Sequence, residues 1–270
     1  MGPDELPAFD LILATVDRVA EPARLLDSLE RQTHRRFRVL LVDQNDDDRL
    51  APVLAAHESL DVVRLRSPHG LSRARNVALS RLRGQIVAFP DDDCVYPDDL
   101  LKRVAKGLAA TPSLDGLTGR GAPSPSWAKD SGPLTRGNLW NRAISYTIFL
   151  RREVVQRVGA FDEQLGLPSS SGEEIDYLVR ALDTGARIEY DPTLVVLHEP
   201  ESRNAHTVAT RDGRSIGYIL RKHRYPRQTV ARMLIRPVGG ALVAALRNDR
   251  ARARVHISTL RGRLLGYRAA

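Results

Sequence analysis

The stretch GQIVAFPDDDCVYPDDLL, residues 84–101, runs from an apolar segment directly into three adjacent aspartates. The apolar residues predict a buried strand, and like charges at the end of such a strand are costly unless a cationic group compensates them. Asp91 and Asp93 are two residues apart, so in an extended chain their side chains face the same cavity. Such a carboxylate pair suits a hard divalent cation, which prefers oxygen ligands and commonly bridges to substrate phosphates.

A simpler interpretation of the acidic run is a turn followed by the start of a helix. We expect Asp92 to point away from the cavity, toward solvent or backbone donors. Asp98 and Asp99 come just before the next predicted helix, where acidic residues favour the helix dipole, and we expect no further role for them. The run by itself therefore leaves a metal site and a turn both open.

Predicted strands and helices alternate through the first half of the chain. The predicted strands are 9–15, 37–43, 61–67 and 85–90, and the predicted helices are 21–33, 51–57 and 70–84. This alternation indicates βαβ units and a parallel, twisted sheet, in which ligands bind beyond the carboxyl ends of the strands. Polar residues follow three of these strands, at Thr15 and Asp17, at 43–48 and at 91–93, and they are expected to meet at one edge of the sheet.

The second half of the chain has a different character. Residues 118–138 are rich in Gly, Pro and Ser and predict a long surface loop. A strand, a helix and a turn are predicted within 143–166, a helix over 171–185 and a strand over 187–200.

Composition limits the class of protein. The chain has 270 residues, of which 42% are hydrophobic and 27% charged, as expected of a globular soluble protein. Cys94 is the single cysteine, which excludes a disulfide framework and a zinc site made of cysteines. No secretory signal is recognisable and the apolar runs look too short to span a bilayer, so we expect a cytoplasmic protein.

Positive charge is concentrated in the last fifty residues. The net charge is +8, but residues 221–270 contain 13 basic residues and one acidic residue. Apolar residues in this tail recur at helical spacing among the arginines: Met233, Leu234, Val238, Leu242, Leu246, Ile257, Leu260 and Leu264. The pattern predicts basic amphipathic helices, either on an anionic membrane surface or packed back on the domain. We expect a peripheral protein at the inner face of the membrane; nucleic acid is not the expected partner.

Three further residues could complete a site at the acidic strand end. His198 ends the predicted strand LVVLHEP, where a neutral imidazole could add a nitrogen ligand, although a lone histidine is more often structural. Arg73 and Arg75 lie in GLSRARN at a helix start, where they could neutralise a diphosphate. Taken alone, the two arginines are an exposed helix face.

The segment SSGEEIDYLVRAL offers a candidate general base. Ser171 and Glu174 have the spacing of a capping box, in which the glutamate only satisfies the helix terminus. The functional interpretation makes Glu174 a base presented at a helix N-terminus. Glu173 and Asp176 lie on another part of the helix surface and are weaker candidates, and the choice between Glu173 and Glu174 stays open.

The ordered motifs LILATVDR, VLLVDQNDDD, GLSRARNVAL, GQIVAFPDDDCVYPDDLL, FLRREVVQRVGAFDE and GEEIDYLVRAL resemble those of the family-two glycosyltransferases, over about residues 8–200. The resemblance implies a GT-A fold, that is, a Rossmann-like α/β domain with a mostly parallel twisted sheet flanked by helices. It also implies an inverting enzyme that takes a sugar from a nucleoside diphosphate with the help of Mn²⁺ or Mg²⁺.

The resemblance also assigns roles to individual residues. Thr15, Asp43 and Gln44 are expected to line the nucleoside pocket, with Arg73 near the base or diphosphate and Arg75 in the same nucleotide site. Gln44 replaces an aspartate that is common in the family at this position.

The metal and the acceptor have their own expected residues. Asp91 is expected near the ribose and the metal, Asp93 on the metal itself, and His198 as the histidine that completes this DxD-type site. Glu174 takes the place of the acid that activates the acceptor, which is most often the aspartate of GED in the family.

These observations predict a GT-A domain over 1–213, with a nucleotide half over about 1–110 and an acceptor half over about 111–213, followed by a basic helical tail over 214–270. The expected activity is transfer of a sugar from a nucleoside-diphosphate sugar to a hydroxyl acceptor, a glycan or a lipid-linked glycan, in the synthesis of cell-surface polysaccharides or glycoconjugates. The alternatives are a sugar nucleotidyltransferase, although the loop LATVDRVAEP lacks the glycines such an enzyme needs, and a non-enzymatic protein that binds anionic surfaces through the tail.

Overall fold

The structure is a computed structural model and describes residues 6–124, 126–166, 171–198 and 205–269. It divides into two compact units. The first is built from residues 1–161 and 177–200, and the second from residues 162–176 and 201–270. The border between the units falls inside one helix, α6 (Glu173–Asp183).

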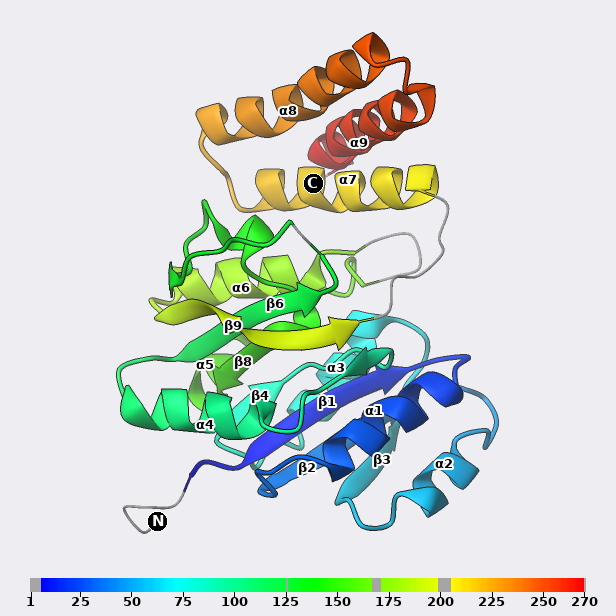
Figure 1. The fold of residues 1–270 in the computed structure, drawn as a ribbon, viewed down its shortest axis with the longest axis vertical. Helices are drawn as coiled ribbons and strands as arrows, with labels where there is room; N and C mark the ends of the chain where they lie inside the picture. Colours follow the sequence, from blue (N-terminus) through cyan, green and yellow to red (C-terminus); the bar gives the residue numbers. More distant parts are fainter. Residues whose placement is uncertain (1–5, 125, 167–170, 199–204, 270) are drawn as a thin grey trace. The chain divides into compact units, whose positions relative to one another are not determined.

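A mixed β-sheet forms the centre of the first unit (Figure 1). Its strands are β1 (Phe9–Thr15), β2 (Phe37–Asp43), β3 (Val62–Arg66), β4 (Ile86–Ala88), β5 (Cys94–Val95), β6 (Gly116–Ala122), β7 (Gly132–Pro133), β8 (Ile148–Arg151) and β9 (Ile188–His198). Their order is β3-β2-β1-β4-β8-β6-β9-β5, with β7 paired to β9. The first four strands are parallel, as the sequence predicts, whereas β8 is antiparallel to both of its neighbours.

Helices cover both faces of this sheet. They are α1 (Ala20–Glu30), α2 (Ala51–Ala56), α3 (Leu71–Leu79), α4 (Leu100–Ala110) and α5 (Arg152–Val158), with short 3₁₀ turns η1 (Leu139–Asn141) and η2 (Ser145–Thr147). Side chains of α1 and α4 share one core cluster with alternate residues of the strands. Helices α3 and α5 contact the strands as well but stay outside that cluster, which places them on the opposite face.

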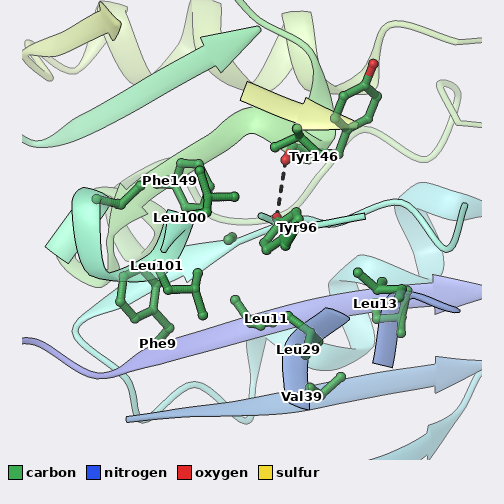
Figure 2. Packing of buried hydrophobic residues seen from close by; sticks show 14 of the residues in the cluster. Phe9, Leu11, Leu13, Leu29, Val39, Tyr96, Leu100, Leu101, Tyr146 and Phe149 are labelled. Atoms are coloured by element: carbon green, nitrogen blue, oxygen red, sulfur yellow. Dashed lines mark hydrogen bonds between the residues drawn. The ribbon is translucent and has the colours of Figure 1, made fainter. Parts of the chain in front are cut away.

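The main core lies between α1, α4 and the sheet (Figure 2). Leu11 and Leu13 of β1 point into it, while Ile12 between them is equally buried on the other face. The buried hydroxyl of Tyr96 in this core donates a hydrogen bond to the carbonyl oxygen of Tyr146 at 3.2 Å. The core therefore fixes β1, β4 and the chain after β4, which carries the acidic run.

One predicted helix ends early. The sequence predicts a helix over 70–84 with Gly84 as its stop, but α3 ends at Leu79. Gly84 serves another purpose, because a Cβ there would lie 2.7 Å from the backbone nitrogen of Asp10. The chain leaves the helix to pass close beside β1, and only glycine fits at that point.

The second unit contains three long helices, α7 (Ala205–Lys222), α8 (Arg227–Leu246) and α9 (Arg250–Ala269). Helix α7 runs unbroken past residue 213, and the predicted division there stays a prediction. Glycines four residues apart on α7 and α9 let the two backbones touch: Gly213, Gly217, Gly262 and Gly266. A Cβ on Gly217 would lie 2.1 Å from the carbonyl oxygen of Arg263. Any larger residue would push the helices apart.

The expectation that every apolar run is too short to span a bilayer is wrong for α8. Within the described residues this helix alone passes the length and composition test for a membrane span, with a mean hydropathy of 1.4 over its apolar window. Only 11% of that window is buried. Arg232 and Arg236 divide the apolar sequence of this continuous helix into shorter runs, so the length of the helix is not evident from the apolar runs alone.

Candidate active site

The carboxyl ends of β1, β2 and β4 meet, as the sequence predicts. Thr15, the last residue of β1, is in register with Asp43, the last residue of β2. On the other side of β1, Ala14 forms a parallel bridge with Asp91, just beyond β4. The polar groups that follow these strands are therefore neighbours at one edge of the sheet.

Ser145 and Arg75 hold the carboxylate of Asp91. The hydroxyl of Ser145 lies 3.0 Å from each of its carboxylate oxygens, and Arg75 Nη2 lies 3.1 Å from Oδ1. Arg75 is fully buried, and its guanidinium lies over the rings of Phe89 and Phe161. The carboxylate itself is 28% exposed, so Asp91 is oriented but still accessible.

Asp92 contradicts the sequence expectation. It is buried rather than directed to solvent, and it accepts hydrogen bonds from the Thr15 hydroxyl at 2.7 Å and from Arg18 Nη1 at 2.5 Å. Burial raises the pKa of Asp92, against the lowering effect of Thr15 and Arg18. Asp92 thus fastens the acidic run to the loop after β1.

Asp93 lies between Arg18 and His198. Its carboxylate is 2.8 Å from Arg18 Nη1 and 3.0 Å from His198 Nε2. Burial alone would raise the pKa of Asp93, but the hydrogen bond and charge of His198, together with Arg18, lower it to about 2. Asp93 is therefore ionised at neutral pH, the form that binds a cation.

His198 is positioned by the strand at whose end it stands. It pairs with Cys94 across β9 and β5, and its ring stacks on Tyr146 with centroids 4.8 Å apart and planes 8° from parallel. Tyr146 in turn needs Gly121, since a Cβ there would lie 2.3 Å from the tyrosine oxygen. The strand pairing with Cys94 and the stacking on Tyr146 thus hold the imidazole of His198 against Asp93.

Asp91, Asp93 and His198 together form a candidate metal centre. One ligand atom from each of the three residues lies within 4.8 Å of the other two. Two carboxylate oxygens and an imidazole nitrogen are a donor set that fits Mn²⁺ and Mg²⁺. The DxD interpretation of the sequence is supported by this geometry, and Asp98 and Asp99 stay outside it, at the start of α4.

Asp43 and Gln44 are buried among protein partners. Asp43 contacts Arg64 at 2.6 Å and Arg66 at 3.0 Å, and it accepts hydrogen bonds from Asn45. Burial would raise the pKa of Asp43, but these partners lower it below the ordinary value. Gln44 accepts a hydrogen bond from the backbone of Gly70 and so ties the end of β2 to the start of α3.

The two arginines of GLSRARN separate in the structure. Arg75 is buried against Asp91, whereas Arg73 is exposed on α3. The prediction that either one contacts a nucleotide stays a prediction. Arg75 already has a defined contact, with the carboxylate of Asp91 in the candidate metal centre.

Glu174 belongs to the second unit and lies in the first turn of α6. Ser171, the first residue of the predicted capping box, donates its hydroxyl hydrogen to Asp212 at 2.8 Å and its backbone N–H to the hydroxyl of Ser215 at 2.9 Å. The carbonyl of Gly172 accepts the first helical hydrogen bond, from Asp176. Glu173 is buried and Glu174 is half-buried, so Glu174 is the more accessible of the two.

Sequence reasoning missed Arg18, Ser145 and Tyr146. Arg18 binds two of the three adjacent aspartates but stands in an irregular loop, next to Asp17 with its positive φ of 57°. The sequence signal that could have identified Arg18 is a basic residue three positions after the end of β1 at Thr15. Ser145 and Tyr146 come from a 3₁₀ turn in the second half of the chain, which no periodicity identifies.

Comparison with solved structures defines the fold class. PcManGT, a mannosyltransferase from Pyrobaculum calidifontis solved in complex with GDP-Man and Mn²⁺, has a TM-score of 0.72 at 17% identity, over 98% of this chain and 88% of that one. S. aureus TarS 1–349 in complex with UDP-GlcNAc gives 0.65 at 18% identity, over 94% and 92%. The fold is that of the GT-A glycosyltransferases.

Sequence comparison identifies the family. The profile described as "Glycosyl transferase family 2" matches residues 11–157, more than half of the chain. The succinoglycan biosynthesis protein ExoM of Rhizobium meliloti is 27% identical over 222 residues, which cover 77% of this chain and 71% of ExoM. The chain belongs to glycosyl transferase family 2, and the resemblance and the fold predicted from the sequence are confirmed. Membership of this family argues against the two alternatives from the sequence, a sugar nucleotidyltransferase and a non-enzymatic surface-binding protein.

Proposed function

We propose that this protein is an inverting, metal-assisted glycosyltransferase that moves a sugar from a nucleoside diphosphate to an acceptor hydroxyl. The observation that carries the proposal is the convergence of Asp91, Asp93 and His198, with ligand atoms within 4.8 Å of one another, at the carboxyl edge of the sheet. Ligands of open α/β sheets bind at this edge.

The residues around these ligands prepare the site. Arg75 and Ser145 orient Asp91, and His198 orients Asp93. Bound Mn²⁺ or Mg²⁺ would supply electrostatic stabilisation of the negative charge that builds up on the departing diphosphate. Arg18 holds Asp92 and Asp93 and adds positive charge to the same region.

Transfer requires a base for the acceptor. The acceptor oxygen forms a bond to the anomeric carbon while the bond from that carbon to the diphosphate oxygen breaks, and the hydroxyl proton passes to a carboxylate. We assign this carboxylate to Glu174, which the family resemblance and its accessibility both favour over Glu173. A single displacement inverts the anomeric centre, and the nucleoside diphosphate leaves.

The proposed substrates follow from the relatives. ExoM is named for succinoglycan biosynthesis, and the TarS of S. aureus is named a poly(ribitol-phosphate) β-N-acetylglucosaminyltransferase. We assign this chain to the synthesis of cell-surface polysaccharides or glycoconjugates, with a nucleoside-diphosphate sugar as donor.

The test is a thermal-shift screen of nucleoside diphosphates, each with and without Mn²⁺. We expect a rise in the melting temperature that requires both the correct nucleotide and the metal. Asp93→Asn should abolish the metal-dependent part, while the matched control Asp99→Asn, an exposed acid of the same run outside the site, should keep it. A metal-independent shift, or equal loss in both variants, would overturn the metal assignment.

The base is tested separately. Glu174→Gln should abolish sugar transfer and leave the nucleotide- and metal-dependent thermal shift intact, because the amide cannot accept the proton. Glu173→Gln is the matched comparison. If Glu173→Gln alone stops turnover, the base is Glu173, and if both variants turn over normally, neither residue is the base. Product stereochemistry, read by NMR, checks inversion.

A further inference from the structure

Helix α8 has an inner face that the protein covers. Val230, Pro237 and Ala244 are buried at intervals of seven residues, and α8 contacts α9. Gly240 completes this face, since a Cβ there would lie 2.6 Å from the ring of His256 on α9. One side of the helix is therefore fixed against its neighbour.

A specific polar contact sets the rotation of α8. Proline has no N–H, so Pro237 cannot donate to the carbonyl of Met233 one turn earlier. The guanidinium of Arg263 on α9 donates to that carbonyl instead. The inner face is thus fixed by packing and by a hydrogen bond, and this determines which residues point away from α9.

The outer face of α8 is apolar and exposed. Its large aliphatic side chains recur at intervals of three or four residues, with exposed fractions of 66% for Ile235, 41% for Val238, 62% for Leu242 and 88% for Leu246. A helix that is apolar all round is normally buried. A contiguous apolar patch on a surface marks a site of association.

Positive charge surrounds this patch. Arg232, Arg236 and Arg247 are exposed on or next to α8, and exposed arginines recur along α9. Residues 221–270 carry 13 basic residues against one acidic residue. The combination of an apolar face and flanking arginines is complementary to an anionic lipid surface. The same charge disfavours dimerisation through α8, because pairing two such faces would bring two strongly positive surfaces together.

Spanning the bilayer is opposed by the arginines inside α8, and by Arg236 above all. Arg236 stands at the middle of the 20-residue helix, so a spanning α8 would put its charge near the bilayer centre. An arginine at the centre of a spanning helix strongly disfavours insertion into the bilayer. In the interfacial orientation, Arg236 reaches the headgroups while the aliphatic side chains enter the acyl boundary.

We propose that α8 is a membrane-docking helix that lies in the interface of an anionic lipid bilayer, with Ile235, Val238, Leu242 and Leu246 as its inserted residues. Flanking arginines bind the lipid phosphates. This docking is separate from the chemistry of sugar transfer, and it makes the protein peripheral rather than integral.

The experiment is flotation of the full chain with vesicles, either of phosphatidylcholine alone or of an equal mixture with phosphatidylglycerol. We expect flotation with the anionic vesicles only, weakened by high salt. The double variant Ile235→Ser, Leu242→Ser should weaken binding at least about tenfold, because it removes two inserted aliphatic side chains. The matched control places serine at Val19 and Leu197, exposed apolar residues of the first unit, and should bind as the wild type does.

Each other outcome contradicts the proposal. Equal binding to neutral vesicles, or unchanged binding of the α8 variant, would rule out this docking mode. Resistance to alkaline carbonate extraction would indicate a spanning helix, and a wild-type dimer that the α8 variant converts to a monomer, seen by sedimentation velocity without lipid, would indicate self-association. The nucleotide thermal shift of the α8 variant should be that of the wild type, which separates failure of docking from failure of the proposed function.

Discussion

Replacing Lys222 by methionine removes an ammonium group that joins two carboxylates in the second unit. Lys222 Nζ lies 2.7 Å from Asp176 Oδ1 and 2.6 Å from Asp162 Oδ2. Asp176 is fully buried, and His223 Nε2 contacts the same oxygen at 2.8 Å. Methionine keeps most of the apolar stem of the lysine, so the loss is mainly electrostatic.

The size of the loss follows from burial. Removing one partner of a buried ion pair costs about 3–5 kcal/mol. Lys222 is 28% exposed, His223 still faces Asp176, and the hydroxyl of Tyr218 still donates to Asp162, so the expected cost lies below that range, at about 2–3 kcal/mol. Since 1.4 kcal/mol is a factor of ten, the protection of α7 against opening should fall about 30- to 150-fold.

Hydrogen exchange followed by mass spectrometry measures this effect in α7 itself and does not require the two units to unfold together. Lys102→Met on α4 is the matched control, because Lys102 is exposed in the first unit. The control should leave α7 unchanged. Wild-type protection of α7 in the Lys222 variant would refute the reasoning that this ion network holds α7 to the start of α6.

The same network predicts a dependence on pH. Burial would raise the pKa of Asp162, but the hydrogen bond and charge of Lys222 and the other donors lower it. A group with a lowered folded pKa contributes its stability above its unfolded pKa, about 3.9 for aspartate, and loses it as the pH falls through the folded value. The difference between wild type and Lys222→Met should therefore shrink below about pH 4; a difference that widens on acidification would refute the assignment.

Two glycine substitutions test the close packing of each unit. Gly121→Ala places a Cβ 2.3 Å from the oxygen of Tyr146, so the ring that stacks on His198 should shift, and under the proposed function Mn²⁺-dependent nucleotide binding should weaken about tenfold in a titration. Gly266→Ala places a Cβ 1.8 Å from the carbonyl oxygen of Arg214 and should destabilise the second unit by about 1–3 kcal/mol in hydrogen exchange of α9. Gly239→Ala, with open space around its Cβ, is the control and should be neutral or stabilising; equal effects of the two helix substitutions would exclude the packing explanation.

The meeting of polar residues at one edge of the sheet could be predicted, because the carboxyl ends of parallel strands lie side by side. Thr15, Asp43 and Asp91 each follow an apolar run, and strand geometry alone brings such residues to one edge. It could also be predicted that the side chains of Asp91 and Asp93 face the same side, because side chains alternate along an extended chain. These inferences need only local periodicity.

The partners of the site could not be predicted, because they depend on tertiary contacts. Asp92 is fixed by Thr15, 77 residues away, and by Arg18 in a loop of irregular backbone. The position of Ser145 beside Asp91 depends on the antiparallel entry of β8 into the sheet, which no pattern in the sequence specifies.

In the C-terminal tail the sequence predicts the helices but not how they pack. Apolar spacing predicts helices there, and α8 and α9 are helical, but that spacing does not predict the close packing at the glycines of positions 213, 217, 262 and 266. Their spacing of four residues is visible in the sequence. Which helices they join is not, because a small-residue stripe does not name its partner.

Charge balance at the strand end gives the three adjacent aspartates a common explanation. Asp91 faces Arg75, Asp92 faces Arg18, and Asp93 shares Arg18 with His198. With a neutral imidazole, three carboxylates oppose two guanidinium groups, so these groups together carry one negative charge. Under the proposed function, a divalent cation changes that balance to one positive charge, which is the sign that a diphosphate requires. A fully neutralised acidic run would bind the cation less well, and a run without arginines would leave the bound diphosphate facing uncompensated carboxylates.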